Sequence, residues 1–168
     1  MSFMVKEIKL KNRHRLKKKE LKKLLKTLFD VFKTQLPIEP GSIELGVTDT
    51  GINAIVIDNE LLGIIIDDKP FLTLRGILKY RPGARAVTVD MGAIKFVSSG
   101  ADVMAPGIID ADQTVEPGDL VWIRDEKHHQ PLAIGEALIT GPEMVSSTSG
   151  KAVKVLHHIG DELWNYGK

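Results

Sequence analysis

Residues 87–108 read VTVDMGAIKFVSSGADVMAPGI, and this stretch decides the fold. Its first three residues alternate between apolar and polar, as in a half-buried strand. Asp90 can cap a helix that Gly100 ends, because glycine takes the left-handed conformation without a Cβ clash. Pro106 and Gly107 then predict a turn. A helix of about eight residues cannot persist alone, so we expect it to pack on a surrounding sheet.

Short strands separated by glycines and polar turns follow this stretch. Residues 120–124 and 132–140 are predicted strands on either side of a polar hairpin tip, 125–130, and residues 152–157 supply a final strand. Several short strands with one embedded helix are typical of a small closed or nearly closed barrel.

The first half of the chain has a different pattern. Leucines and phenylalanines in residues 17–32 recur at helical spacing and form one apolar stripe, with lysines on the other faces. Residues 42–66 predict a meander of three strands, and residues 72–80 a short helix. Residues 3–10 predict a further strand. The segment Arg-Pro-Gly at 81–83 is the expected domain boundary.

Three blocks in order over about 70 residues make the chain resemble the PUA domain, an RNA-binding module found in pseudouridine synthases and archaeosine transglycosylases. The first block contains Asp90, Gly92-Ala93-Ile94, Phe96, Ser99-Gly100-Ala101, Val103-Met104 and Pro106-Gly107; the others span 117–121 and 133–137, and then 150–155. Residues 70–75 with Lys79-Tyr80, and the closing residues 160–164, resemble the malignant T-cell amplified sequence family and the N-terminal part of ligatin, in which a pre-PUA domain precedes PUA.

This resemblance implies an α+β N-terminal domain over residues 1–84, followed by a mainly-β PUA pseudo-barrel over residues 85–168. It implies RNA binding without catalysis, to transfer RNA or ribosomal RNA. It further implies a role in translation initiation, reinitiation or ribosome recycling on the small ribosomal subunit, with a SUI-domain protein as partner, in an archaeal-like version. A targeting accessory of a transfer-RNA or ribosomal-RNA modification enzyme is an alternative function, as is a small enzyme or a protein-interaction module.

Charge is divided unevenly along the 168 residues. The net charge is only +1, but residues 1–26 hold eleven Lys or Arg against two acidic residues, a local balance of +9 that leaves −8 for the remainder. Such asymmetry favours contact with a polyanion. The expected secondary basic surface consists of Arg13, Arg15, Lys18, Lys19, Lys22 and Lys23. A solvated helix face that only maintains solubility is the competing interpretation.

The expected RNA contacts lie around Gly100. In PUA domains the end of this helix and the following strand line the RNA surface, where a small residue lets backbone groups approach a nucleotide. The candidate RNA-binding residues are Lys95, Ser98, Ser99, Gly100, Ala101, Asp102 and Val103, with Arg85, Lys151 and Lys154 as phosphate contacts. A simple helix stop is the competing interpretation of Gly100. Few aromatic residues are present, so base stacking is not the expected mode.

Other chemistry finds little support in the sequence. Asp90 without a second acid or base at catalytic spacing predicts a helix cap rather than a catalytic carboxylate, and no phosphate loop or nucleophile elbow is present. The pairs His128-His129 and His157-His158 lack further ligands at metal spacing, and cysteine is absent, so we expect neither metal nor cofactor. With no long apolar run, a cytoplasmic protein without membrane contact is expected.

Overall fold

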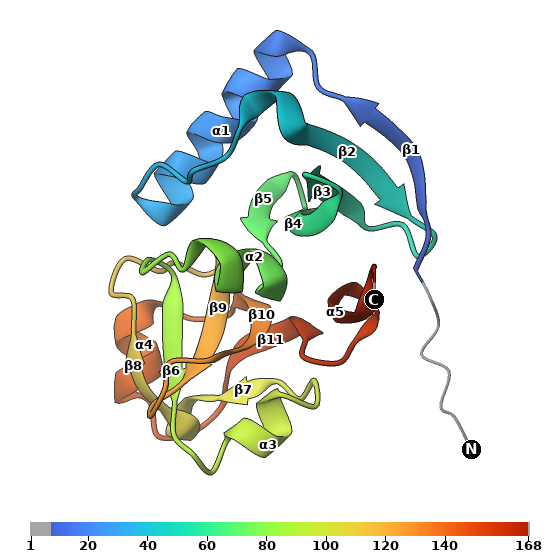
Figure 1. Ribbon diagram of the computed structural model, residues 1–168. Helices are drawn as coiled ribbons and strands as arrows, with labels where there is room; N and C mark the ends of the chain where they lie inside the picture. The colour runs from blue at the N-terminus through green and yellow to red at the C-terminus, as the bar shows by residue number, and fades with distance from the viewer. Residues whose placement is uncertain (1–7, 168) are drawn as a thin grey trace, which may run out of the picture. The chain divides into compact units, whose positions relative to one another are not determined.

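The computed structural model describes residues 8–167, which fold into two compact units. The first unit comprises the chain up to Pro82 together with the residues from Asp161 onward, and the second comprises Gly83–Gly160 (Figure 1). The expected strand at 3–10 lies mostly outside the described residues. An α+β unit followed by a mainly-β unit confirms the predicted fold class.

The first unit is a five-stranded antiparallel sheet with helices. Its elements are β1 (Leu10–Arg15), α1 (Lys18–Phe32), the 3-10 helix η1 (Pro40–Ser42), β2 (Ile43–Thr48), β3 (Asn53–Ile57), β4 (Glu60–Ile66), β5 (Lys69–Leu72), α2 (Leu74–Tyr80) and α5 (Glu162–Asn165). The strands lie in chain order, β1-β2-β3-β4-β5, so each is joined to its neighbour by a direct connection. The predicted meander is therefore confirmed, with one strand more at each end.

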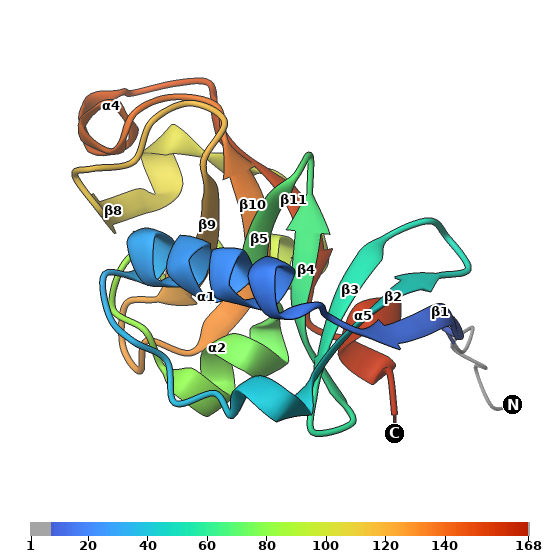
Figure 2. The same ribbon diagram turned by 90° about the horizontal axis from the view of Figure 1, so that it is seen from above.

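Helix α1 lies across the sheet next to β5 (Figure 2). Leu24, Leu28 and Phe32 are buried, and the Phe32 and Phe71 ring centroids are 4.9 Å apart. The buried face of α1 is narrower than the apolar stripe predicted for residues 17–32, because Phe29, which belongs to that stripe, is 50% exposed. The lysines between these positions face away from the sheet and are exposed.

The sequence does not predict strand β5, because Asp67-Asp68 and Pro70 indicate a turn that ends the preceding strand. The two aspartates do form the tight turn, both with positive φ. Pro70 nevertheless sits within β5, which is the edge strand of the sheet. An edge strand tolerates proline because one side of its backbone has no neighbouring strand to receive a hydrogen bond.

The second unit is a six-stranded sheet that curls on itself. Its elements are β6 (Ala86–Val89), α3 (Ile94–Val97), β7 (Val103–Met104), the 3-10 helix η2 (Ala105–Gly107), β8 (Ile108–Ala111), β9 (Leu120–Asp125), β10 (Pro131–Ala137), α4 (Gly141–Ser146) and β11 (Lys151–His158). The strand order is β7-β11-β10-β9-β6-β8, antiparallel except for the parallel pair β6 and β9.

The strand order itself requires the curl. β7 and β8 occupy opposite edges of the sheet, yet only the three residues of η2 separate them in the chain. Four Cα steps span at most about 14 Å, whereas six flat strands would extend about 24 Å from edge to edge. The sheet must therefore bend until its edges approach each other, which produces the predicted pseudo-barrel around a core of valines, isoleucines and alanines.

Helix α3 is shorter than expected, with one hydrogen-bonded turn flanked by turns at 91–93 and 98–100. Asp90 caps the turn at 91–93 that leads into α3, since its Oδ1 accepts a hydrogen bond from Ala93 N at 3.0 Å, whereas Ala93 itself is the N-cap residue of the helix. At the other end, Gly100 has φ +98 and donates its N–H to Val97 O, while Ala101 N donates to Phe96 O. This Schellman pairing closes the helix early.

The compact units differ from the predicted limits of 1–84 and 85–168 at the C-terminus. Helix α5 belongs to the first unit, where Arg75 Nε donates to Trp164 O at 2.7 Å and the Arg75 guanidinium lies 4.3 Å from the Trp164 ring centroid. Trp122, by contrast, is buried in the second unit and donates its Nε1 to Ala84 O. Among the helices formed by residues 8–167, none combines the length and apolarity needed to cross a membrane.

Candidate nucleic-acid interface

A groove of about 620 Å³ opens on the second unit between α3 and β7; we call it the α3–β7 groove. It is lined by Asp90, Gly92, Ala93, Phe96, Val97, Ala101, Asp102, Val103, Met104, Pro106, Gly107 and Lys151. Two of these lining residues approach closely, because a Cβ on Gly107 would lie 3.3 Å from the Ala93 Cβ. The start of α3 and η2 therefore meet through small residues.

The glycine corner, residues 99–101, borders this groove. A Cβ at position 100 would lie 2.9 Å from Cδ2 and Nε2 of His158, and the positive φ disfavours any side chain there. Both adjacent serines turn their hydroxyls back onto α3: Ser98 Oγ donates to Ile94 O at 2.7 Å and Ser99 Oγ to Lys95 O at 2.8 Å. Gly100 thus fits both a helix stop and a close backbone approach.

Asp102 joins the glycine corner to β11. Its Oδ1 accepts from Val155 N at 2.9 Å, and its Oδ2 lies 3.3 Å from Lys151 Nζ. The hydrogen bond from Val155 is the main reason that the pKa of Asp102 lies below its ordinary value, with Lys151 and Lys154 adding to the effect against desolvation by burial. The carboxylate is therefore paired, and the ammonium of Lys151 sits at the groove while its side chain stays 61% exposed.

The predicted RNA-binding residues are only partly brought together. Ala101, Asp102, Val103 and Lys151 line the α3–β7 groove. Lys95, Ser98 and Ser99 lie on α3 and the turn after it, and Lys154 is exposed on β11. Val103 is 1% exposed, so it forms part of the groove wall but offers a ligand almost no accessible surface.

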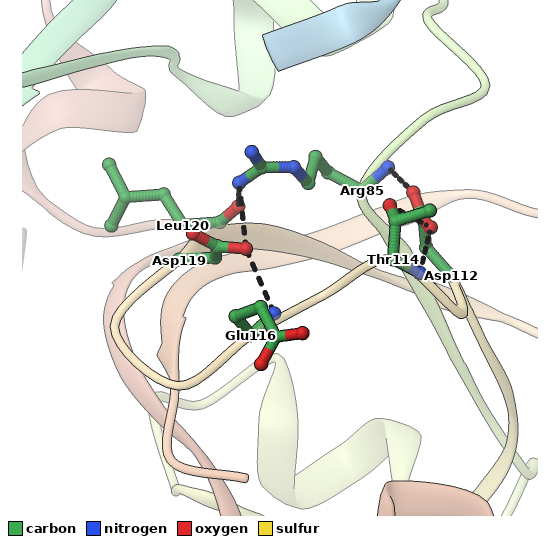
Figure 3. A network of polar contacts seen from close by, with 6 residues as sticks. All are labelled: Arg85, Asp112, Thr114, Glu116, Asp119 and Leu120. Carbon is green, nitrogen blue, oxygen red and sulfur yellow. Dashed lines mark hydrogen bonds and ion pairs between the residues drawn. The ribbon is translucent and has the colours of Figure 1, made fainter. Parts of the chain in front are cut away.

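Arg85 lies elsewhere. It precedes β6 while Asp90 follows it, so the strand places them about 16 Å apart. Its Nη1 donates to Leu120 O at 3.1 Å and is 3.7 Å from Asp119 Oδ2, and its backbone N donates to Asp112 Oδ2 at 2.7 Å (Figure 3). Burial raises the pKa of Asp112, but hydrogen bonds from Arg85 and Thr114 outweigh it and leave the pKa lowered. Arg85 is therefore held by these hydrogen bonds and this ion pair, and it does not line the α3–β7 groove.

Two exposed side chains of the groove were missed by the sequence reasoning. Phe96 is 64% exposed and Met104 is 47% exposed, although both are large and apolar. Helical spacing could have indicated the exposure of Phe96. Ala93, Ile94 and Val97 pack toward the core, so the side chain of Phe96, which lies between them in the sequence, points away from it.

The secondary basic surface lies on the first unit. Lys18, Lys19, Lys22 and Lys23 are exposed on α1, and Arg15 is exposed at the end of β1. Arg13 is engaged: its Nε lies 2.8 Å from Glu44 Oε2 and its Nη2 donates to Asn59 Oδ1 at 2.8 Å. The lysines of α1 are therefore the larger share of this surface.

The two histidine pairs singled out in the sequence lie on different elements and do not form one cluster. His128 and His129 are exposed at the hairpin tip between β9 and β10, whereas His157 is completely buried on β11. Within residues 8–167, no group of three His, Asp or Glu side chains could hold a metal ion.

Comparison with known proteins identifies the fold of the second unit and the relatives of the whole chain. The PUA domain family model matches residues 85–159. Translation machinery-associated protein 20 of Saccharomyces cerevisiae is 34% identical over 89% of this chain and 85% of its own length. The chain belongs to this family of PUA-domain proteins. Relatives named malignant T-cell-amplified sequence 1 match as well, which confirms the resemblance seen in the sequence.

Archaeal members of the family are also similar. An uncharacterized protein of Methanocaldococcus jannaschii is 42% identical over 95% of this chain and 99% of its own. The crystal structure of a hypothetical protein from Pyrococcus horikoshii superimposes with a TM-score of 0.78 at 34% identity, covering 90% of this chain and 97% of that one. The family is thus translation-associated by the names of its members, and this chain is of the archaeal type.

Proposed function

We propose that the protein binds unpaired RNA at the α3–β7 groove, without catalysis, as part of the translation machinery. The single observation that carries this proposal is the groove itself: a concave site on a PUA barrel, bounded by the glycine corner and by the ammonium of Lys151. Unpaired RNA offers base edges and 2′-hydroxyls that such a surface can reach, whereas paired RNA presents a broad minor groove.

Lysines supply the electrostatic part of the proposal. Lys151 lines the groove, Lys95 is exposed on α3 next to the lining residue Phe96, and Lys154 is exposed on β11. Lys151 and Lys154 both act on the Asp102 carboxylate. Contacts of this kind with phosphates position RNA and make affinity fall with salt, but they select no sequence. The names of the relatives support RNA of the translation apparatus as the ligand, namely transfer RNA or small-subunit ribosomal RNA.

The finer role is proposed from the family resemblance. We assign the protein to initiation, reinitiation or recycling on the small ribosomal subunit, in the cytoplasm, with a SUI-domain protein as partner. Asp90 supports a non-catalytic assignment, because its Oδ1 accepts a hydrogen bond from Ala93 N and so holds the turn that leads into α3.

Crosslinking in cells followed by sequencing of the attached RNA tests the ligand. Transfer RNA or small-subunit ribosomal RNA is expected, and recovery of no RNA would contradict the proposal. In vitro, Lys151→Gln combined with Lys154→Gln should weaken binding to a single-stranded oligonucleotide, while Lys127→Gln at the hairpin tip is the matched control. Equal loss in the control would remove the groove from consideration. Thermal melting checks that each variant stays folded.

A further inference from the structure

The most exposed large apolar side chain among residues 8–167 stands at the α3–β7 groove. Phe96 is 64% exposed, and Met104, another large apolar lining residue, is 47% exposed. Since α3 already packs on the barrel through Ala93, Ile94 and Val97, the fold does not require an aromatic ring at position 96. A flat apolar ring left in solvent beside a groove points to a flat ligand group that covers it.

Charge around the groove favours a nucleotide as that ligand. Lys95 is next to Phe96 in the sequence, and Lys151 lines the groove directly. The lining carboxylate nearest to Lys151, Asp102, is already paired with it and with Val155 N. A nucleotide combines a planar apolar base with an anionic phosphate, which matches an aromatic wall bounded by ammonium groups.

A second carboxylate offers base recognition. Asp90 lines the same groove, and its Oδ1 is occupied by Ala93 N at 3.0 Å. Within residues 8–167 no hydrogen bond or ion pair engages its Oδ2. A carboxylate oxygen only accepts hydrogen bonds, so this atom favours an exocyclic amine, which cytosine carries at the position where uracil has a carbonyl oxygen.

From these observations we propose that the groove holds one unpaired nucleotide, whose base stacks on Phe96 while Asp90 Oδ2 accepts a hydrogen bond from its exocyclic amine. This inference rests on the proposed function and adds two specific roles to it: Phe96 is the stacking platform, and Asp90 selects amino-bearing bases. Base stacking therefore contributes at this one position although aromatic residues are few in the chain.

Binding of fluorescently labelled rC8 and rU8 to the full chain tests both roles, because these oligonucleotides differ only in the base edge. Wild-type protein should bind rC8 more tightly than rU8, by about 5- to 150-fold. Asp90→Asn keeps an oxygen for the cap and replaces the free acceptor by an amine, so it should reverse this preference in favour of rU8. An unchanged preference would overturn the role of Asp90.

Phe96→Leu should weaken binding of both oligonucleotides by about 5- to 150-fold, while Phe96→Trp retains affinity. Val145→Ser is the matched control, since Val145 is an exposed apolar residue on α4 outside the groove. If Phe96→Leu binds as wild type while the Lys151 and Lys154 double variant is weakened, RNA binding at the groove stands and the stacking role is wrong. Wild-type protein that binds neither oligonucleotide would overturn both proposals and leave the patch to a protein partner.

Discussion

The imidazole ring of His158 occupies the space that a side chain on Gly100 would need. Ring atoms Cδ2 and Nε2 lie 2.9 Å from the position of a Cβ at residue 100. The same ring is held by its other nitrogen, Nδ1, which lies 3.2 Å from Ser98 O and 2.8 Å from Ile159 O. The last strand of the barrel and the glycine corner therefore support each other, and residue 100 is restricted both by its backbone and by a neighbour.

Gly100→Ala is expected to destabilise the protein by about 2–5 kcal/mol, because backbone strain at positive φ and overpacking each contribute. Chemical denaturation measures the loss. Gly150→Ala separates the two causes: Gly150 has φ +93, but a Cβ at this position would meet no atom within 4 Å, so only the backbone strain of about 1–2 kcal/mol remains. Equal losses at the two positions would show that His158 gives way.

His158 should position the glycine corner through its Nδ1–H. Because both neighbours of Nδ1 are carbonyl oxygens, that nitrogen must carry the proton. Amide hydrogen exchange at Ser99 and Gly100 should accelerate in His158→Ala and be largely restored in His158→Asn, since the asparagine amide presents a donor near the place of Nδ1. Equal exchange in wild type and His158→Ala would contradict this positioning role.

The helix, the meander and the barrel strands could be predicted because their signals are local. Apolar spacing in α1 and alternation in β2 to β4 follow from burying one face, and glycine and proline mark the turns. Strand β5 could not be predicted, because a proline such as Pro70 normally ends a strand. The structure accommodates Pro70 only because β5 lies at the edge of the sheet.

The candidate site was less predictable, because it depends on contacts between distant segments. Gly100 carried a local signal, but the ring of His158 beside it comes from 58 positions further along the chain. The sequence predicts Arg85 as a phosphate contact, because its partners are distant in the chain. Only the fold places Asp119 and the Leu120 carbonyl next to its guanidinium. The exposure of Phe96 likewise became evident only once the core side of α3 was known.

Acid should destabilise the hairpin tip through Asp125. This buried carboxylate accepts hydrogen bonds from the backbone N–H groups of Lys127, His128 and Gln130. Burial raises the pKa of Asp125, but these bonds outweigh it and leave the pKa below its unfolded value of 3.8. Because the folded pKa is the lower one, the contribution to stability is present above pH 3.8 and is lost as the pH falls through the folded pKa.

Asp125→Asn removes this titration, so its free energy of unfolding should vary less with pH than the wild-type value does as the pH falls from 3.8 through the folded pKa. Denaturant unfolding between neutral and acidic pH measures the difference, and Glu126→Gln, one position along on the exposed tip, is the control. A wild-type slope in Asp125→Asn would show that another group is responsible.

The lysines of α1 are expected to contribute a sequence-independent attraction to RNA. Lys18, Lys19, Lys22 and Lys23 are exposed along one helix. Each phosphate contact with single-stranded RNA releases about 0.7 counterions, so replacing all four lysines by Gln should reduce the slope of log affinity against log salt by up to about 3. Affinity for different sequences should fall to the same degree, because phosphate contacts do not distinguish bases. Titrations at several salt concentrations measure the slope. Lys69→Gln with Lys127→Gln, two exposed lysines outside α1, is the control, and a quadruple variant with the wild-type slope would mean that the helix is merely solvated.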